Sequence, residues 1–180
     1  MPRGAKRGGA PEEFTCSRCG QVHEGPPQAY GADYPDAWAA VPEAQRSKRV
    51  VMSEEQCIID RRDFFVRARI VVPVVDGPGP LEWGIWVSLS QKDFLRMAKL
   101  WSKPGRESEP PYVGVLETEL PGYPSTLHLK ALVHTRPVGE RPTMELEPTD
   151  HPLVREQHDG ITTQRLREIA EMLLHPAGPA

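Results

Sequence analysis

The chain has little cysteine, few aromatic residues and no large excess of charge of either sign. Its 180 residues include three cysteines and 7% aromatic residues, and the formal net charge is −3. Because the net charge is small, no global attraction to nucleic acid arises and we expect no nucleic-acid partner. No apolar run reaches the length of a membrane-spanning helix or forms a secretory signal, so we expect no membrane association and a cytoplasmic protein with reduced thiols.

Proline and glycine are plentiful by contrast. Twenty prolines and fifteen glycines predict many turns and a loop-rich fold rather than a helical bundle. Residues 1–13 hold glycine, proline and charge without apolar periodicity, and we predict a disordered tail there. The length of the remaining chain favours one domain, so residues 14–180 are expected to form a single α+β domain.

Residues 16–23, Cys-Ser-Arg-Cys-Gly-Gln-Val-His, carry the clearest chemical pattern. The Cys16-x-x-Cys19 spacing lets two thiolates bind one ion from a tight turn, and Gly20 permits the backbone conformation that such a turn needs. His23 and the distant Cys57 would complete a Cys₃His set, which is a common structural zinc site. The pattern predicts a structural Zn²⁺ ion, with His151 as an alternative fourth ligand.

Other interpretations of these cysteines stay open. A redox-active Cys-x-x-Cys pair usually opens a helix after a strand, whereas Cys16 and Cys19 follow a polar tail and precede glycine and proline. Two thiols without any ligand are a further possibility. Cys57 stands beside Ile58 and Ile59, and such a cysteine is as consistent with a small buried core residue as with a metal ligand.

Hydrophobic periodicity predicts strands and helices after residues 16–23, the segment called the knuckle from here on. Runs 64–75 and 81–89 are β-rich, flank a glycine-proline turn and are expected to pair as an antiparallel hairpin. Further strands are predicted at 112–116, 127–135 and 141–146, and helices at 36–49, 90–102, 150–158 and from 162 onward. This order predicts an α+β fold: a twisted, mainly antiparallel sheet with helices packed on it and an N-terminal zinc-knuckle-like arm.

Several segments beyond the knuckle are distinctive in combination. They are Gln56-Cys57-Ile58-Ile59, Phe64-Phe65-Val66-Arg67, Trp83-Gly84-Ile85-Trp86-Val87-Ser88-Leu89-Ser90, Leu120-Pro121-Gly122-Tyr123-Pro124, Arg141-Pro142 and Glu147-Pro148-Thr149-Asp150-His151-Pro152-Leu153. Together with the knuckle they resemble the bacterial family called domain of unknown function 2199, over about residues 14–170. That family has no established activity. The resemblance implies a small, soluble, bacterial protein whose N-terminal cysteines look like metal ligands.

Residues 145–159 hold the densest cluster of polar functional groups. The cluster comprises Glu145, Glu147, Asp150, His151, Glu156, His158 and Asp159. Carboxylates and imidazoles can bind a catalytic metal or act as general acid and base. The simpler interpretation is that Asp150 caps a helix, Pro152 occupies its first turn and the other charges are solvated.

Tryptophans and arginines share the predicted hairpin. Trp83 and Trp86 fall on opposite faces of one strand, so at least one of them is expected in the core. The other would lie beside Arg67 and Arg69 as a recognition surface, or would be covered by a second layer.

The sequence favours a zinc-stabilised, non-enzymatic binding or interaction domain with an unknown protein or small-molecule partner, because it contains no recognisable catalytic set. One alternative is a metal-dependent hydrolase-like enzyme that uses the 145–159 cluster. Another is a regulatory or immunity-type partner protein.

Overall fold

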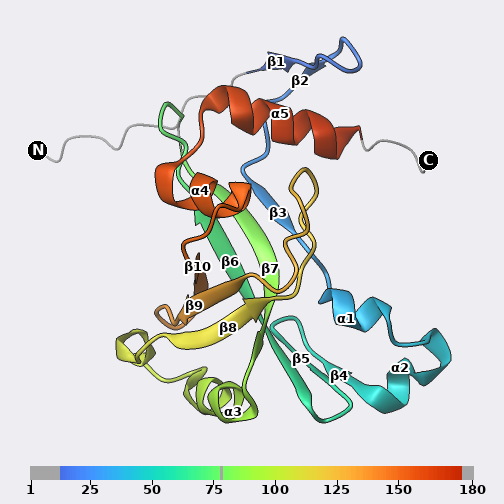
Figure 1. The fold of residues 1–180 in the computed structure, drawn as a ribbon, viewed down its shortest axis with the longest axis vertical. Coiled ribbons are helices and arrows are strands. Elements are labelled where there is room, and N and C mark those ends of the chain that lie inside the picture. The colour runs from blue at the N-terminus through green and yellow to red at the C-terminus, as the bar shows by residue number, and fades with distance from the viewer. Residues whose placement is uncertain (1–12, 78, 176–180) are drawn as a thin grey trace, which may run out of the picture.

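The structure, a computed structural model, describes residues 13–77 and 79–175 and contains both helices and sheets (Figure 1). The strands are β1 (Phe14–Thr15), β2 (Val22–His23), β3 (Ala29–Gly31), β4 (Val50–Met52), β5 (Gln56–Ile59), β6 (Asp63–Val72), β7 (Leu81–Leu89), β8 (Tyr112–Leu116), β9 (Lys130–His134) and β10 (Thr143–Leu146). The helices are α1 (Asp36–Ala39), α2 (Glu43–Arg49), α3 (Gln91–Leu100), the 3₁₀ helix η1 (Arg106–Ser108), α4 (Pro152–Asp159) and α5 (Thr163–Leu174). The predicted tail lies almost entirely outside the described residues.

Strands β6 to β10 close into a five-stranded barrel. β6 and β7 form the predicted antiparallel hairpin, and β8, β9 and β10 continue the sheet antiparallel. β10 then returns to β6 and pairs with it in parallel at Thr143 and Arg69. The α+β class is therefore confirmed, whereas the closure of the twisted, mainly antiparallel sheet into a barrel was not predicted. Pattern reasoning missed the closure because the joining strands are more than 70 residues apart in the chain.

The barrel interior holds the main hydrophobic core. Alternate residues of β6 point inward, so Val66, Ala68, Ile70 and Val72 are fully buried while Arg67 and Arg69 lie on the outer face. From β7, Trp83 and Ile85 join the same core. Helix α3 packs against β6, and α4 packs against β6 and β10. The barrel therefore has an apolar inside and a partly polar outside.

Side-chain caps begin three of the helices. Ser90 accepts a hydrogen bond from the Asp93 amide at 3.1 Å at the start of α3, where the sequence predicted a helix. Thr162 caps α5 in the same way. The prediction that Asp150 caps α4 is wrong, because the cap is His151, whose Nδ1 accepts from the Leu153 amide at 3.2 Å.

A second, smaller core lies on the outer face of the hairpin. It contains Val41, Cys57, Ile59, Phe65 and Trp86. The β4–β5 hairpin continues the sheet beyond β6, while α1 contributes partly buried residues to this cluster. Trp83 and Trp86 are thus both buried, one in each core. Trp86 is therefore covered by a second layer and does not form an exposed recognition surface beside Arg67 and Arg69.

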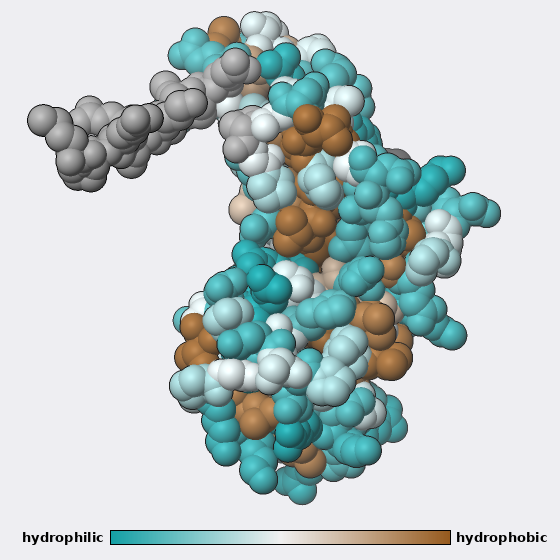
Figure 2. Space-filling model, turned by 90° about the vertical axis from the view of Figure 1, so that its left-hand side faces the viewer, coloured by the Kyte–Doolittle hydropathy of each residue, from teal (hydrophilic) through white to brown (hydrophobic). Residues whose placement is uncertain are grey.

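The surface offers scattered hydrophobic residues. Figure 2 shows one face, on which hydrophobic patches are separated by hydrophilic residues. Exposed residues such as Val22, Val51 and Val113 come from different strands. Within residues 13–77 and 79–175, no helix combines the length and apolar character required to cross a bilayer.

Candidate metal centre

The knuckle is a short β-hairpin with a tight loop. β1 and β2 pair antiparallel, which sets Phe14 opposite His23. Within the loop, the Cys16 amide donates to the Gln21 carbonyl at 2.8 Å, and the Gly20 amide donates to the Cys16 carbonyl at 2.9 Å. Gly20 has φ +70°, a left-handed conformation that favours glycine. This loop brings the side chains of Cys16, Cys19 and His23 together.

The knuckle packs on the last turns of α5, far from it in sequence (Figure 1). Phe14 and Cys16 contact Ala170 in a small apolar cluster. The Ser17 amide and hydroxyl donate to the two carboxylate oxygens of Glu171, which holds the pKa of that carboxyl below its ordinary value. The Arg18 guanidinium donates to the His175 carbonyl at 2.8 Å. The knuckle is therefore attached to the C-terminal helix, whereas Cys57 belongs to the second core.

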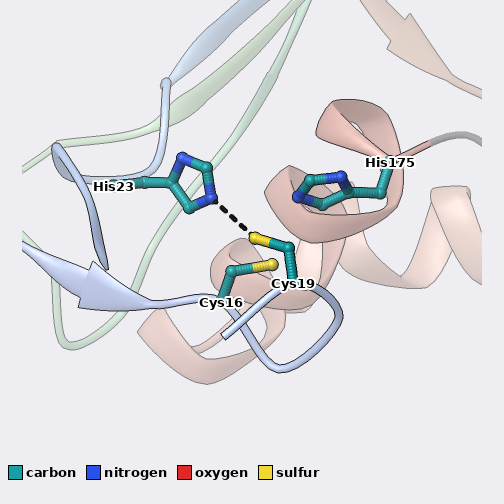
Figure 3. A group of neighbouring side chains, drawn as sticks. All are labelled: Cys16, Cys19, His23 and His175. Carbon is teal, nitrogen blue, oxygen red and sulfur yellow. Dashed lines mark hydrogen bonds between the residues drawn. The ribbon is translucent and has the colours of Figure 1, made fainter. Parts of the chain in front are cut away.

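Four possible ligand atoms meet where the knuckle contacts the end of α5 (Figure 3). They belong to Cys16, Cys19, His23 and His175, and all lie within 4.8 Å of one another. Cys19 Sγ and His23 Nε2 are 3.3 Å apart. Ligand atoms around tetrahedral zinc are separated by about 3.3–3.8 Å, given the usual Zn–N and Zn–S bond lengths. Only a small contraction of the group is required to reach that geometry.

The chemistry of the group fits zinc. Two cysteines and two histidines form a Cys₂His₂ set, which is typical of structural zinc sites. His175 Nε2 is buried and has no hydrogen-bond partner among residues 13–77 and 79–175. A buried polar atom without a partner is unfavourable, and coordination to a metal ion would satisfy this nitrogen. Cys16 is only 1% exposed, so an ion bound there would be shielded from water on that side.

Two of the predicted ligands are not brought to this group. Cys57 lies on β5 in the second core and is fully buried, and burial raises the pKa of its thiol to about 11. Cys57 packs there as a small apolar side chain beside Phe65 and Trp86, away from the other cysteines. His151 caps α4 through Nδ1, and its Nε2 lies 3.2 Å from the Pro124 carbonyl oxygen.

His175 is the candidate ligand that sequence reasoning missed. It directly follows α5 and is the fourth member of the Cys/His group, the role that the sequence assigned to Cys57 or His151. Its only sequence signal is a histidine at the end of an amphipathic helix. Nothing in the local pattern reveals that this helix end contacts the knuckle more than 150 residues earlier.

The 145–159 cluster does not gather around a common point. Among the residues that the structure describes, the Cys/His set is the one group arranged to hold a metal ion. His158 Nε2 lies 3.2 Å from the Leu146 carbonyl oxygen, and Glu156 accepts hydrogen bonds from Tyr123 and Arg165. Glu145 faces His134 across the strand pair. Most of these groups therefore have partners that support the local structure.

The fold and the site together define an α+β protein with a closed five-stranded barrel and a Cys/His cluster that joins its first strands to its last helix. The chain belongs to the family described as "Uncharacterized protein conserved in bacteria (DUF2199)", whose model matches residues 15–161. The family resemblance seen in the sequence is thus confirmed. The matched region includes Cys16, Cys19 and His23 and ends before His175. No curated protein and no solved structure matches the chain significantly.

Proposed function

We propose that the protein is a zinc-stabilised, non-enzymatic binding domain. The observation that carries this proposal is the convergence of Cys16, Cys19, His23 and His175, whose ligand atoms lie within 4.8 Å of one another. In this proposal the four residues bind one Zn²⁺ ion, and the ion links the knuckle to the end of α5.

A four-ligand set supports a structural role for the ion. Structural zinc sites use four protein ligands, whereas catalytic sites usually have three and leave one position for water or substrate. Four protein donors are available here, so no position is left open for a substrate. Any ligand of the protein would therefore bind elsewhere.

The link through zinc also bears on β3. The chain runs from His23 through a short proline-containing segment into β3, which pairs in parallel with β7 on the barrel. Gln28, in that segment, donates to the Gly79 carbonyl at 2.6 Å. A zinc ion at the knuckle would fix the start of this segment, so β3 would be held at both ends.

The hydrolase alternative has less support. His151 and His158 each lie at hydrogen-bond distance from a backbone carbonyl oxygen, and Glu156 bonds to Tyr123 and Arg165. A catalytic metal site would require at least three of these side chains to point at one place. Their individual structural partners make the cluster a poor candidate for catalysis.

Metal analysis of the purified protein tests the zinc proposal. We expect about one zinc ion per chain, and less than about a tenth of an ion in Cys16→Ser, because one lost ligand greatly weakens a four-ligand site. His175→Ala should also lose zinc. This variant distinguishes a ligand set completed by His175 from the set completed by Cys57 that the sequence suggested.

Cys57→Ser is the matched control. It removes a cysteine from the second core, so zinc content should stay at the wild-type value even though stability falls. The zinc proposal would be wrong if the wild-type protein held no zinc after supplementation. It would also be wrong if Cys57→Ser lost the metal while His175→Ala retained it.

A further inference from the structure

A charged groove lies on the outer face of the barrel, across β6 and β7. Its volume is about 850 Å³. Its lining includes Arg67 and Arg69 from β6, Gly84 from β7 and Gly31 from β3. Four arginines and three glutamates line it in total. The groove is therefore polar and carries an excess of positive charge.

Three of the four arginines have partners within the fold. Arg141 forms a bidentate ion pair with Glu55, with N···O distances of 2.7–3.0 Å. Arg69 pairs with Glu82 and Glu140. Arg106 is 3% exposed and donates to four backbone carbonyls, including that of Trp101 at 2.6 Å. These arginines, and the glutamates they bind, are used in holding the groove together.

Arg67 differs from the other three. In the part of the chain that the structure describes, its guanidinium has no hydrogen bond and no ion pair, and its Nε is buried without a partner. The ring of Trp86 lies 5.9 Å from its central carbon, a distance that gives only weak stabilisation. The other guanidinium N–H groups of Arg67 have no partner among the described residues and are left to water or to a ligand in the groove.

Two glycines provide the space around Arg67. A Cβ at Gly31 would lie 3.3 Å from Arg67 Nη2, which is closer than most such contacts. A Cβ at Gly84 would lie 3.2 Å from Gly31 Cα, so the missing side chains also let β3 approach β7 closely. The absence of both side chains thus leaves room beside Nη2 of Arg67, which lines the groove.

We propose that this groove binds a small molecule through a carboxylate or phosphate group, and that Arg67 is the residue that binds this group. A guanidinium offers paired N–H donors that match the oxygens of either group. Glu82 and Glu140 pair with Arg69, and Glu55 pairs with Arg141, so the charge of Arg67 stays available for a ligand. This inference deepens the proposed binding function by naming a ligand class.

Nuclear magnetic resonance of the zinc-loaded protein tests the proposal. Inorganic phosphate and succinate are titrated separately, and the amides of Gly31 and Gly84 and the Nε–H signal of Arg67 are followed. We expect a saturable shift of all three signals with at least one probe, and the stronger response identifies the preferred group. Arg67→Gln should weaken binding by about ten- to a hundredfold, because it removes a charge-assisted hydrogen-bond pair.

Arg62→Gln is the control, because its side chain is 76% exposed and lies outside the groove. It should leave the titration unchanged. If Arg67→Gln does not fold, Gly31→Ala replaces it: the added methyl would crowd Nη2 and should weaken binding while the charge is kept. The proposal is overturned if neither probe shifts these signals at tens of millimolar, or if the two arginine variants respond alike. Zinc content of the same samples reports separately on the metal site.

Discussion

The barrel and the knuckle are stabilised in different ways. The barrel encloses a core of fully buried aliphatic and aromatic side chains, among them Ile70, Leu81 and Ile85. Among the described residues, the apolar cluster between the knuckle and α5 consists of three buried side chains, those of Phe14, Cys16 and Ala170. Its other contacts include exposed hydrogen bonds, such as those between Ser17 and Glu171, and an edge-on ring contact between His23 and His175. One region depends on apolar burial, whereas the other has little of it.

This difference explains why a metal site would occur at the knuckle. A hairpin of two two-residue strands is not stable alone in water, and a three-residue apolar cluster adds little. Four metal ligands from both ends of the chain would supply the missing stability. The barrel needs no such ion, so removal of metal should loosen one region and leave the other folded.

The largest effect is expected for a truncation inside the barrel. Ile70 is fully buried on β6, and Ile70→Ala should lower the free energy of unfolding by about 2–5 kcal/mol, because it leaves a cavity in a packed core. Urea unfolding, followed by tryptophan fluorescence, measures the change. The loss should be the same with and without a zinc chelator.

Val113→Ala on the same barrel is the control for this truncation. Val113 is 63% exposed on β8, so the change should stay within about 0.5 kcal/mol. If the effect of Ile70→Ala depended strongly on the chelator, the two regions would not be stabilised independently.

A smaller effect is expected from the buried thiol of Cys57. Burial raises its pKa from 9.0 to about 11, so its contribution to stability is complete below about pH 9 and is lost as the pH rises through about 11. Between these values the free energy of unfolding should fall by up to about 1.4 kcal/mol per pH unit more in the wild type than in Cys57→Ala. Urea unfolding at a series of pH values gives both slopes.

Equal slopes for the two proteins would contradict the buried position of Cys57. Alkylation offers an independent check. In zinc-free native protein at mildly alkaline pH, the exposed Cys19 should react well before Cys57. Simultaneous reaction would show that the second core opens readily.

The barrel and the knuckle also differ in how much of each could be predicted from the sequence. The strands and helices around the barrel followed from apolar periodicity, because this signal is local. The barrel closure between β10 and β6 did not follow, since one parallel contact joins strands that are distant in sequence. Cys16, Cys19 and His23 lie within eight residues, so spacing alone grouped them. Cys57 lies in the second core, away from this group, and His175 joins the group without having been predicted, because both positions depend on the tertiary fold.

The smallest predicted effect is that of backbone strain on zinc binding, tested by adding the same strain inside the knuckle and far from it. Gly20 and Gly105 both have positive φ, and a Cβ at either would meet no atom within 4 Å. Substitution by alanine therefore adds only the strain of a left-handed backbone, about 1–2 kcal/mol. Gly20→Ala should weaken zinc binding by about 5- to 30-fold, because that strain is imposed on the loop that holds the ligands.

Gly105 directly precedes η1 and lies away from the Cys/His cluster. Gly105→Ala should therefore lower the free energy of unfolding by a similar amount and leave the zinc dissociation constant unchanged. Competition with a chromophoric chelator measures that constant for both variants. If both substitutions weakened zinc binding equally, the knuckle would share its stability with the rest of the protein. If only Gly20→Ala did so, the zinc site would depend on its own loop, as the small apolar cluster beneath it implies.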